Sequence, residues 1–165
     1  MNRTIVLMGV AGSGKTSVGQ ALAARLDCAF LDADDFHPPA NVAKMRAGEP
    51  LTDADRRPWL DAIRAGLHQL HANGESAVLA CSALKQTYRQ QIGDGMANLC
   101  YVYLRVDRAT ARARMRQRTD HFMPPTLIDS QFDALEEPDH ALVVDAGGAL
   151  DDVVEAILAQ LPDTT

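Results

Sequence analysis

Gly9-Val10-Ala11-Gly12-Ser13-Gly14-Lys15-Thr16 is the stretch that decides the fold, and it fits the pattern G-x-x-x-x-G-K-[ST] at every fixed position. The apolar, β-branched run Thr4–Met8 precedes it and predicts a strand buried on both faces. The segment Lys15–Leu26 follows it with apolar residues at helical spacing. A glycine-rich loop between a strand and a helix wraps phosphates with its backbone N–H groups, at the positive end of the helix. The stretch therefore predicts a nucleotide-phosphate site rather than an ordinary glycine-rich turn.

Each part of this phosphate loop has an expected partner. Lys15 would reach the β- and γ-phosphates and act in catalysis, and the Thr16 hydroxyl would ligate Mg²⁺. The remaining nucleotide contacts of the loop are assigned to Gly9, Gly12, Ser13, Gly14 and Ser17.

A dinucleotide-binding loop is the alternative for this glycine-rich segment, because Asp32 lies 20 residues after Gly12. That fingerprint needs a third glycine where this chain has Ser17. It also has no use for the Lys15-Thr16 pair, which a phosphate loop requires. The sequence therefore favours a phosphate loop.

Composition describes one globular domain over residues 1–165. Hydrophobic residues make up 47% of the chain and charged residues 23%, close to the globular average. No apolar run approaches the roughly 18 residues that a membrane span requires, so we expect no membrane association. The three cysteines, Cys28, Cys81 and Cys100, lie too far apart for a disulfide framework. They are typical of small core residues in a reducing compartment, which predicts a cytoplasmic protein.

The charge of the chain is negative overall but unevenly distributed. A formal net charge of −6 argues against nucleic-acid binding, which rests on neutralising phosphates with cations. Residues 105–118 nevertheless hold six arginines and one acid, whereas residues 119–165 hold eleven acids and no lysine or arginine. A local basic segment in an acidic protein indicates a compact anionic ligand.

Short apolar runs alternate with longer amphipathic segments along the whole chain. This alternation predicts βαβ units, and hence an α/β fold with a five-stranded parallel sheet flanked by helices. The other predicted strands are 29–31, 77–81, 99–104 and 142–145, and the other predicted helices are 40–47, 53–72, 108–118, 125–135 and 150–161.

Acidic residues follow the second predicted strand, at the edge where parallel sheets bind ligands. Asp32 fits an outer-sphere role at Mg²⁺, a cation that takes oxygen ligands and keeps several waters. Asp34 would accept the proton of a substrate hydroxyl or orient that hydroxyl. Asp35 is more typical of a solvated loop that caps the next helix. His37 fits either a ligand donor or a packing residue, and its spacing does not decide between them.

Several motifs in the expected order make the chain similar to the gluconate kinases (gluconokinases), which are small phosphate-loop kinases related to shikimate and nucleoside monophosphate kinases. Two residues depart from that pattern, since Ala33 and Asp120 stand where glycine is expected. The matching stretches are residues 9–16, Leu31-Asp32-Ala33-Asp34, His37-Pro38, Asn41, Lys44-Met45, Gly48-Glu49-Pro50-Leu51-Thr52-Asp53-x-Asp55-Arg56-x-Pro58-Trp59-Leu60, Cys81-Ser82-Ala83-Leu84-Lys85, His121-Phe122, Gln131-Phe132 and Leu135-Glu136-x-Pro138.

The resemblance implies an activity and a set of ligands. The family phosphorylates D-gluconate at its 6-hydroxyl with ATP and Mg²⁺, which yields 6-phospho-D-gluconate, and it implies a homodimer. It also implies a fold like that of phosphate-loop nucleoside monophosphate kinases, with a small lid at about residues 114–126. The substrate residues that it implies are Asp34, His37, Lys44, Arg56, Lys85 and His121.

Gluconate is a polyhydroxy anion, so its site needs a cation for the carboxylate and hydrogen-bonding groups for the hydroxyls. Arg56 suits a two-donor fork on the carboxylate, and its alternative is a surface pair with Asp53 or Asp55. Lys85 would hold substrate or the transferring phosphoryl group, and its alternative is a solvated helix lysine. Trp59 is expected to pack its helix rather than to stack on substrate.

The arginines of residues 105–118 have different expected roles. By resemblance, Arg114 and Arg118 lie on one helix face at the edge of the lid, where Arg118 would act in catalysis and Arg114 would bind nucleotide. Arg112 and Arg116 fit equally well a solvated basic face that pairs with the acidic C-terminal third. The loop Ala146-Gly147-Gly148 would flank adenine.

Two other functions compete with gluconate phosphorylation. One is a related kinase that acts on shikimate, another hydroxy acid or a nucleoside monophosphate. The other is a non-catalytic nucleotide-binding module. A GTPase switch would need an N-K-x-D run, which this sequence lacks, and an inactive kinase would be expected to lose Lys15, Asp34 or the lid arginines.

Overall fold

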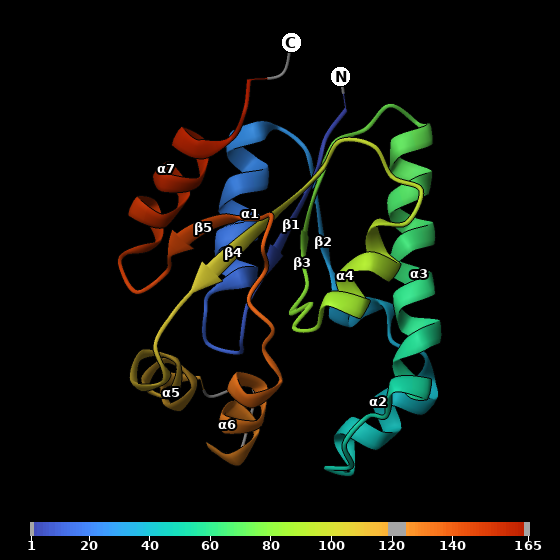
Figure 1. Ribbon diagram of the computed structural model, residues 1–165, viewed down its shortest axis with the longest axis vertical. Coiled ribbons are helices and arrows are strands. Elements are labelled where there is room, and N and C mark those ends of the chain that lie inside the picture. The colour runs from blue at the N-terminus through green and yellow to red at the C-terminus, as the bar shows by residue number, and fades with distance from the viewer. Residues whose placement is uncertain (1, 119–124, 164–165) are drawn as a thin grey trace.

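A five-stranded parallel sheet forms the centre of the computed structural model, which describes residues 2–118 and 125–163 (Figure 1). The strand order is β2-β3-β1-β4-β5, and every neighbouring pair is parallel. This architecture confirms the predicted α/β class. The strands are β1 (Thr4–Met8), β2 (Ala29–Asp32), β3 (Ala77–Ala80), β4 (Leu99–Arg105) and β5 (Leu142–Asp145).

Helices connect the strands and agree with the predicted ranges to within one residue at each end. Two of them, the 3-10 helix η1 and the short helix α4, have no counterpart among the predicted ranges. The helices are α1 (Lys15–Leu26), η1 (Ala33–Phe36), α2 (Pro39–Arg46), α3 (Asp53–Ala72), α4 (Gln86–Gly93), α5 (Arg108–Gln117), α6 (Pro125–Ala134) and α7 (Leu150–Gln160).

Two apolar layers cover the sheet, because side chains of a strand alternate between its faces. Ile5 and Leu7 of β1 pack with α1 and α7, and Leu22 and Ile157 are fully buried there. The opposite face of β1 packs with α3 and α4. Figure 1 shows α1 and α7 on one side of the sheet and α3 and α4 on the other. Burial on both faces explains why β1 is an uninterrupted apolar run.

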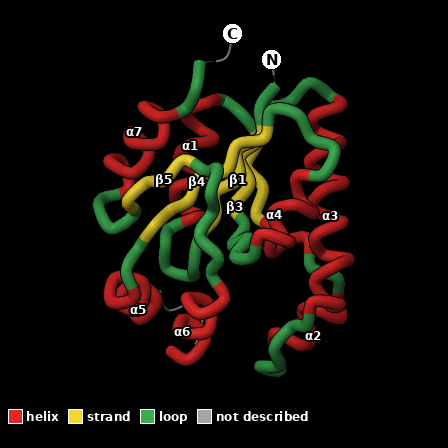
Figure 2. Tube along the Cα trace, viewed as in Figure 1, coloured by secondary structure: helices red, strands yellow, loops and turns green. Residues whose placement is uncertain are grey.

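The carboxyl ends of the strands form the edge that carries the predicted functional residues. The chain order reverses at β1, whose neighbours are β3 and β4, and such a switch point is where open parallel sheets bind ligands. Helix α2 flanks this edge on one side, and α5 and α6 flank it on the other (Figures 1 and 2). Val10, Met115 and Ile128 belong to a small separate cluster beneath α5 and α6.

The hydrophobicity of the helices and the placement of the cysteines bear on two expectations from the sequence. None of the helices described is long and apolar enough to span a bilayer. The three cysteines are free, and Cys81 is buried while Cys28 and Cys100 are half-buried against the first apolar layer. This placement confirms that they are core residues. His121 and Asp120, which the sequence analysis singled out, lie outside the described residues.

Candidate active site

The phosphate loop joins β1 to α1, and two of its glycines are required by its conformation. Gly12 and Gly14 have φ angles of 83° and 89°, in the left-handed region that favours glycine. A Cβ atom at Gly12 would also lie 2.6 Å from the carbonyl oxygen of Ala111, in α5. The loop therefore packs directly against the backbone of α5 (Arg108–Gln117), the helix that carries Arg114.

Lys15 lies folded over the phosphate loop. Its Nζ donates hydrogen bonds to the carbonyl oxygens of Gly9 and Val10, both at 2.9 Å. Enclosure by the protein lowers the pKa of Lys15 to about 8, although the nearby acids Asp34 and Asp32 oppose this shift. A bound phosphate would favour the charged form again, since an adjacent anion raises the pKa of a lysine.

Gln131 is a contact of the phosphate loop that the sequence analysis did not assign. Its Oε1 accepts a hydrogen bond from the backbone N–H of Ala11 at 2.6 Å. Gln131 lies on α6, beyond the predicted lid in the sequence, so this bond ties α6 directly to the loop. The only feature of the sequence that pointed to Gln131 was its place in the Gln131-Phe132 motif, and a motif does not reveal what a side chain contacts.

A pocket of about 270 Å³ lies beside the phosphate loop. Arg114 crosses it and donates to the carbonyl oxygens of Gly12 at 3.2 Å and Ala146 at 2.6 Å. Arg118 also lines the pocket, and so does the predicted adenine loop through Ala146 and Gly148. The structure therefore brings together the phosphate loop, both lid arginines and the loop after β5.

The last arginine of the basic segment lies outside the predicted helix. Helix α5 ends at Gln117, and Arg118 has an extended backbone with φ −79° and ψ 122°. The predicted helix was thus one residue too long, and Arg118 follows α5 instead of sharing one of its faces with Arg114, although both side chains line the same pocket. Arg112 pairs with Asp129 of α6, as its alternative role predicted, whereas Arg116 is exposed.

Asp32 and Thr16 meet at the mouth of the loop. The Thr16 hydroxyl lies 3.5 Å from Oδ2 of Asp32, and Oδ1 of Asp32 accepts from the backbone N–H of Asp34 at 3.0 Å. These oxygen donors are of the kind that Mg²⁺ takes, usually together with waters and substrate phosphates. The described residues contain no cluster of three or more His, Cys, Asp or Glu side chains that would hold a metal alone.

Asp34 and Asp35 follow Asp32 in η1, and both are exposed. The surrounding protein raises the pKa of Asp34 by desolvation, and the neighbouring Asp32 carboxylate raises it further. The positive charge of Lys15 acts in the opposite direction, and so would that of His37 when its ring is protonated. A carboxylate with a raised pKa is a better proton acceptor near neutral pH than an ordinary aspartate.

His37 and Trp59 form a stacked pair, with ring centroids 4.3 Å apart and an interplanar angle of 10°. Trp59 is buried, and its Nε1 donates to the carbonyl oxygen of Ala33 at 2.7 Å. This placement confirms that Trp59 packs its helix. Ala33 is buried in η1 and is absent from the residues with positive φ, so the backbone accommodates an alanine where the family pattern has glycine.

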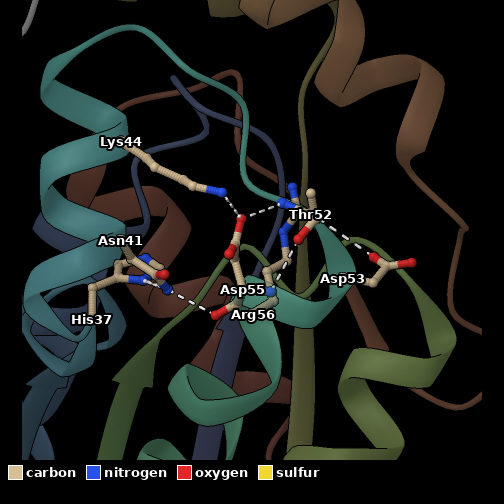
Figure 3. Close-up of polar contacts among 7 residues, drawn as sticks. All are labelled: His37, Asn41, Lys44, Thr52, Asp53, Asp55 and Arg56. Carbon is tan, nitrogen blue, oxygen red and sulfur yellow. Dashed lines mark hydrogen bonds and ion pairs between the residues drawn. The ribbon is translucent and has the colours of Figure 1, made fainter.

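Lys44 is tied to the start of α3. Its Nζ lies 2.8 Å from Oδ2 of Asp55, which also accepts from the backbone N–H of Thr52 at 2.9 Å (Figure 3). Thr52 and Asp55 form a capping box, and these contacts lower the pKa of Asp55 to about 2. Lys44 therefore joins α2 to α3.

Two cations converge on the ring of Tyr88. The guanidinium carbon of Arg56 lies 5.6 Å from the ring centroid, and Lys85 Nζ lies 5.7 Å from it. Arg56 also approaches Asp53 at 3.5 Å, as its alternative role predicted, and the Tyr88 hydroxyl donates to the same carboxylate at 2.7 Å. The charge of Arg56 also acts on His37, which follows η1.

The parallel sheet with its phosphate loop, switch-point crevice and converging basic residues defines a small phosphate-loop kinase. A crystal structure of shikimate kinase from Aquifex aeolicus shares this fold with a TM-score of 0.61 over 94% of each chain, at 16% identity. A family described as an AAA domain matches residues 5–138.

The chain belongs to the gluconokinase family. It is 44% identical to the thermosensitive gluconokinase of Escherichia coli over 135 residues, which cover 82% of this chain and 72% of that protein. It is also similar to the crystal structure of a gluconokinase from Sinorhizobium meliloti, with a TM-score of 0.85 and 42% identity over 95% of this chain and 90% of that one.

Proposed function

We propose that this protein transfers the γ-phosphoryl group of ATP to the 6-hydroxyl of D-gluconate, which yields 6-phospho-D-gluconate. The observation that carries this proposal is the convergence of Arg56 and Lys85 on Tyr88, together with the action of the Arg56 and Asp34 charges on His37. Two cations suit the carboxylate of a hydroxy acid, and the acid–imidazole pair suits its hydroxyls. Membership of the gluconokinase family supports the same acceptor.

On the nucleotide side, the backbone N–H groups of the phosphate loop hold the phosphates, together with the side chains of Lys15 and Ser17. Thr16 and Asp32 would hold Mg²⁺, which neutralises the charge of the β- and γ-phosphates. Arg118 closes on the transferring phosphoryl group, and its charge already acts on Lys15. Arg114 fixes the loop that flanks the base.

On the acceptor side, Asp34 orients the attacking hydroxyl and takes its proton. Arg56 and Lys85 bind the carboxylate, and His37 binds a hydroxyl. Lys44 lines the acceptor side while it holds Asp55, and His121 is proposed as a further substrate contact. Phosphoryl transfer has a loose transition state, so the main task of these groups is to position the acceptor and to stabilise charge.

A coupled assay of ADP formation tests the acceptor. The purified protein is given MgATP with D-gluconate, shikimate, AMP or no acceptor, and gluconate is expected to give the largest kcat/KM. Preference for shikimate or AMP would contradict the proposal. Nucleotide binding without turnover on any acceptor would indicate a non-catalytic module instead.

Arg56→Lys is expected to raise the KM for gluconate more than the KM for ATP. Lysine keeps the charge but loses the planar pair of donors that matches a carboxylate. We expect a rise in the gluconate KM of roughly tenfold, equivalent to about 1.4 kcal/mol. Arg57→Lys, at the exposed neighbouring residue, is the matched control and should change neither constant. Equal effects of Arg56→Lys on both substrates would assign Arg56 to the structural pair with Asp53.

The proposal also includes three properties that the family resemblance implies. These are Mg²⁺ as the metal, a cytoplasmic location and a homodimer. The three free cysteines agree with a reducing compartment. Sedimentation equilibrium of the purified chain measures the oligomeric state, and a monomer at micromolar concentration would contradict the homodimer.

A further inference from the structure

Asn41 is a buried polar residue to which the proposed mechanism assigns no task. It lies on α2 with 3% of its surface exposed, and its amide faces two elements at once. Nδ2 of Asn41 donates to the backbone carbonyl oxygen of Asp55 at 2.9 Å and lies 3.2 Å from Nδ1 of His37 (Figure 3).

The two contacts together decide the protonation of the histidine ring. A backbone carbonyl can only accept, so the NH₂ end of the Asn41 amide must face Asp55. In that orientation the atom that faces Nδ1 of His37 is also Nδ2 of Asn41. This amide nitrogen has a second hydrogen to donate and cannot accept a hydrogen bond. Nδ1 of His37 is therefore the acceptor, and the proton of a neutral ring must be on Nε2.

We infer that Asn41 is a positioning residue that holds His37 in its neutral Nε2–H tautomer, so that this N–H donates to a hydroxyl of the acceptor substrate. The tautomer follows from the contacts themselves, whereas its use on a substrate hydroxyl rests on the proposed function. In the part of the chain that the structure describes, no group hydrogen-bonds Nε2 of His37, which leaves this donor for a ligand.

Other contacts support a fixed and neutral ring. Stacking on Trp59 holds the plane of the imidazole, and Trp59 is itself held by its bond to Ala33. Burial lowers the pKa of His37, and the charge of Arg56 on α3 lowers it further. The carboxylate of Asp34 on η1 opposes these effects without cancelling them. A neutral donor suits a hydroxyl, while the cations Arg56 and Lys85 serve the carboxylate.

Nitrogen-15 NMR of histidine-labelled protein without ligands tests the tautomer directly. His37→Gln assigns the His37 signals by their disappearance. At pH 7 we expect His37 to show an unprotonated Nδ1 and a protonated Nε2. A ring protonated on Nδ1, on both nitrogens or on a rapidly exchanging mixture would overturn the inference, whether or not the protein phosphorylates gluconate.

Two substitutions at residue 41 separate the tautomer from the bond to α3. Asn41→Ala and Asn41→Asp both remove the hydrogen bond from residue 41 to the backbone carbonyl oxygen of Asp55, so both variants lose the contribution of that bond to the structure. Asn41→Asp also places a carboxylate at Nδ1, which favours Nδ1–H and raises the pKa of His37. We expect Asn41→Asp to raise the KM for gluconate by roughly three- to tenfold relative to Asn41→Ala, as expected for loss of one hydrogen bond. The KM for ATP should stay within about twofold of wild type.

A double-mutant cycle asks whether Asn41 acts through His37. A glutamine at residue 37 offers an amide donor and has no tautomers, so Asn41→Asp and Asn41→Ala should have equal effects in the His37→Gln background. Unequal effects there, or equal effects in the wild-type background, would overturn the assignment to substrate binding. Turnover of gluconate by the wild-type protein in the same assay tests the proposed function separately. Thermal melts identify a variant that fails to fold, and the NMR result on the wild-type protein then still decides the tautomer.

Discussion

Lys15→Ala is expected to lower kcat by about 10²–10³-fold, because it removes a fixed cation from the place where negative charge develops. The Lys15 side chain lies over the phosphate loop and donates hydrogen bonds to the carbonyl oxygens of Gly9 and Val10. The substitution removes these two hydrogen bonds but no residue of the apolar layers that cover the sheet, so the variant should stay folded. Steady-state kinetics with gluconate and MgATP measure the loss, and circular dichroism melts check the fold.

Arg25→Ala is the matched control for this variant. Arg25 is another long cation on α1, but it lies at the far end of the helix and pairs with Glu155 on the surface. Its removal should leave kcat unchanged. If folded Lys15→Ala keeps more than about a tenth of wild-type kcat, a loss below roughly 1.4 kcal/mol, the catalytic assignment of Lys15 is wrong.

Most of the fold could be predicted from local patterns, because a parallel sheet covered on both faces produces simple ones. The strands are short apolar runs, and the helices between them are amphipathic, so their bounds agree to within one residue. Helix α4 was not delimited because it is short and polar, and it is held by tertiary contacts. Arg89 of α4 is buried, and it donates to Ala83 in the loop after β3 and to Glu136 beyond α6.

The sequence predicts those contacts of the candidate site that follow from the order of the strands. It does not predict the contacts that depend on how distant segments pack together. Thr16 lies shortly after β1 and Asp32 ends β2, and the carboxyl ends of both strands lie at one sheet edge, so their proximity could be expected. The bond from Ala11 to Gln131 joins residues 120 positions apart, and no local pattern reports such a contact. The same holds for the bond from Asn41 to the backbone of Asp55, which joins α2 to α3.

Asp34 is where the two possible tasks of an acceptor-side carboxylate can be separated. Asp34→Asn preserves the shape and one acceptor oxygen but removes the charge that takes the proton, whereas Asp34→Ala removes both. If Asp34 acts chiefly as a base, both variants should lose kcat alike, by roughly 10²–10⁴-fold. If it chiefly positions the hydroxyl, Asp34→Asn should retain distinctly more activity than Asp34→Ala. We expect large losses of kcat in both, because its raised pKa favours proton acceptance near neutral pH.

Metal dependence distinguishes Asp34 from Asp32. A carboxylate that belonged to the metal site would give variants that recover activity at raised Mg²⁺, which neither acceptor-side task predicts. We expect little recovery for the Asp34 variants and clear recovery for Asp32→Asn, since Asp32 is the acid that approaches Thr16. Asp35→Asn changes the exposed neighbouring carboxylate in the same way and should leave kcat unaltered. Near-normal turnover by Asp34→Ala would remove Asp34 from the active site, and the crevice after β2 would then need a different acceptor-side group.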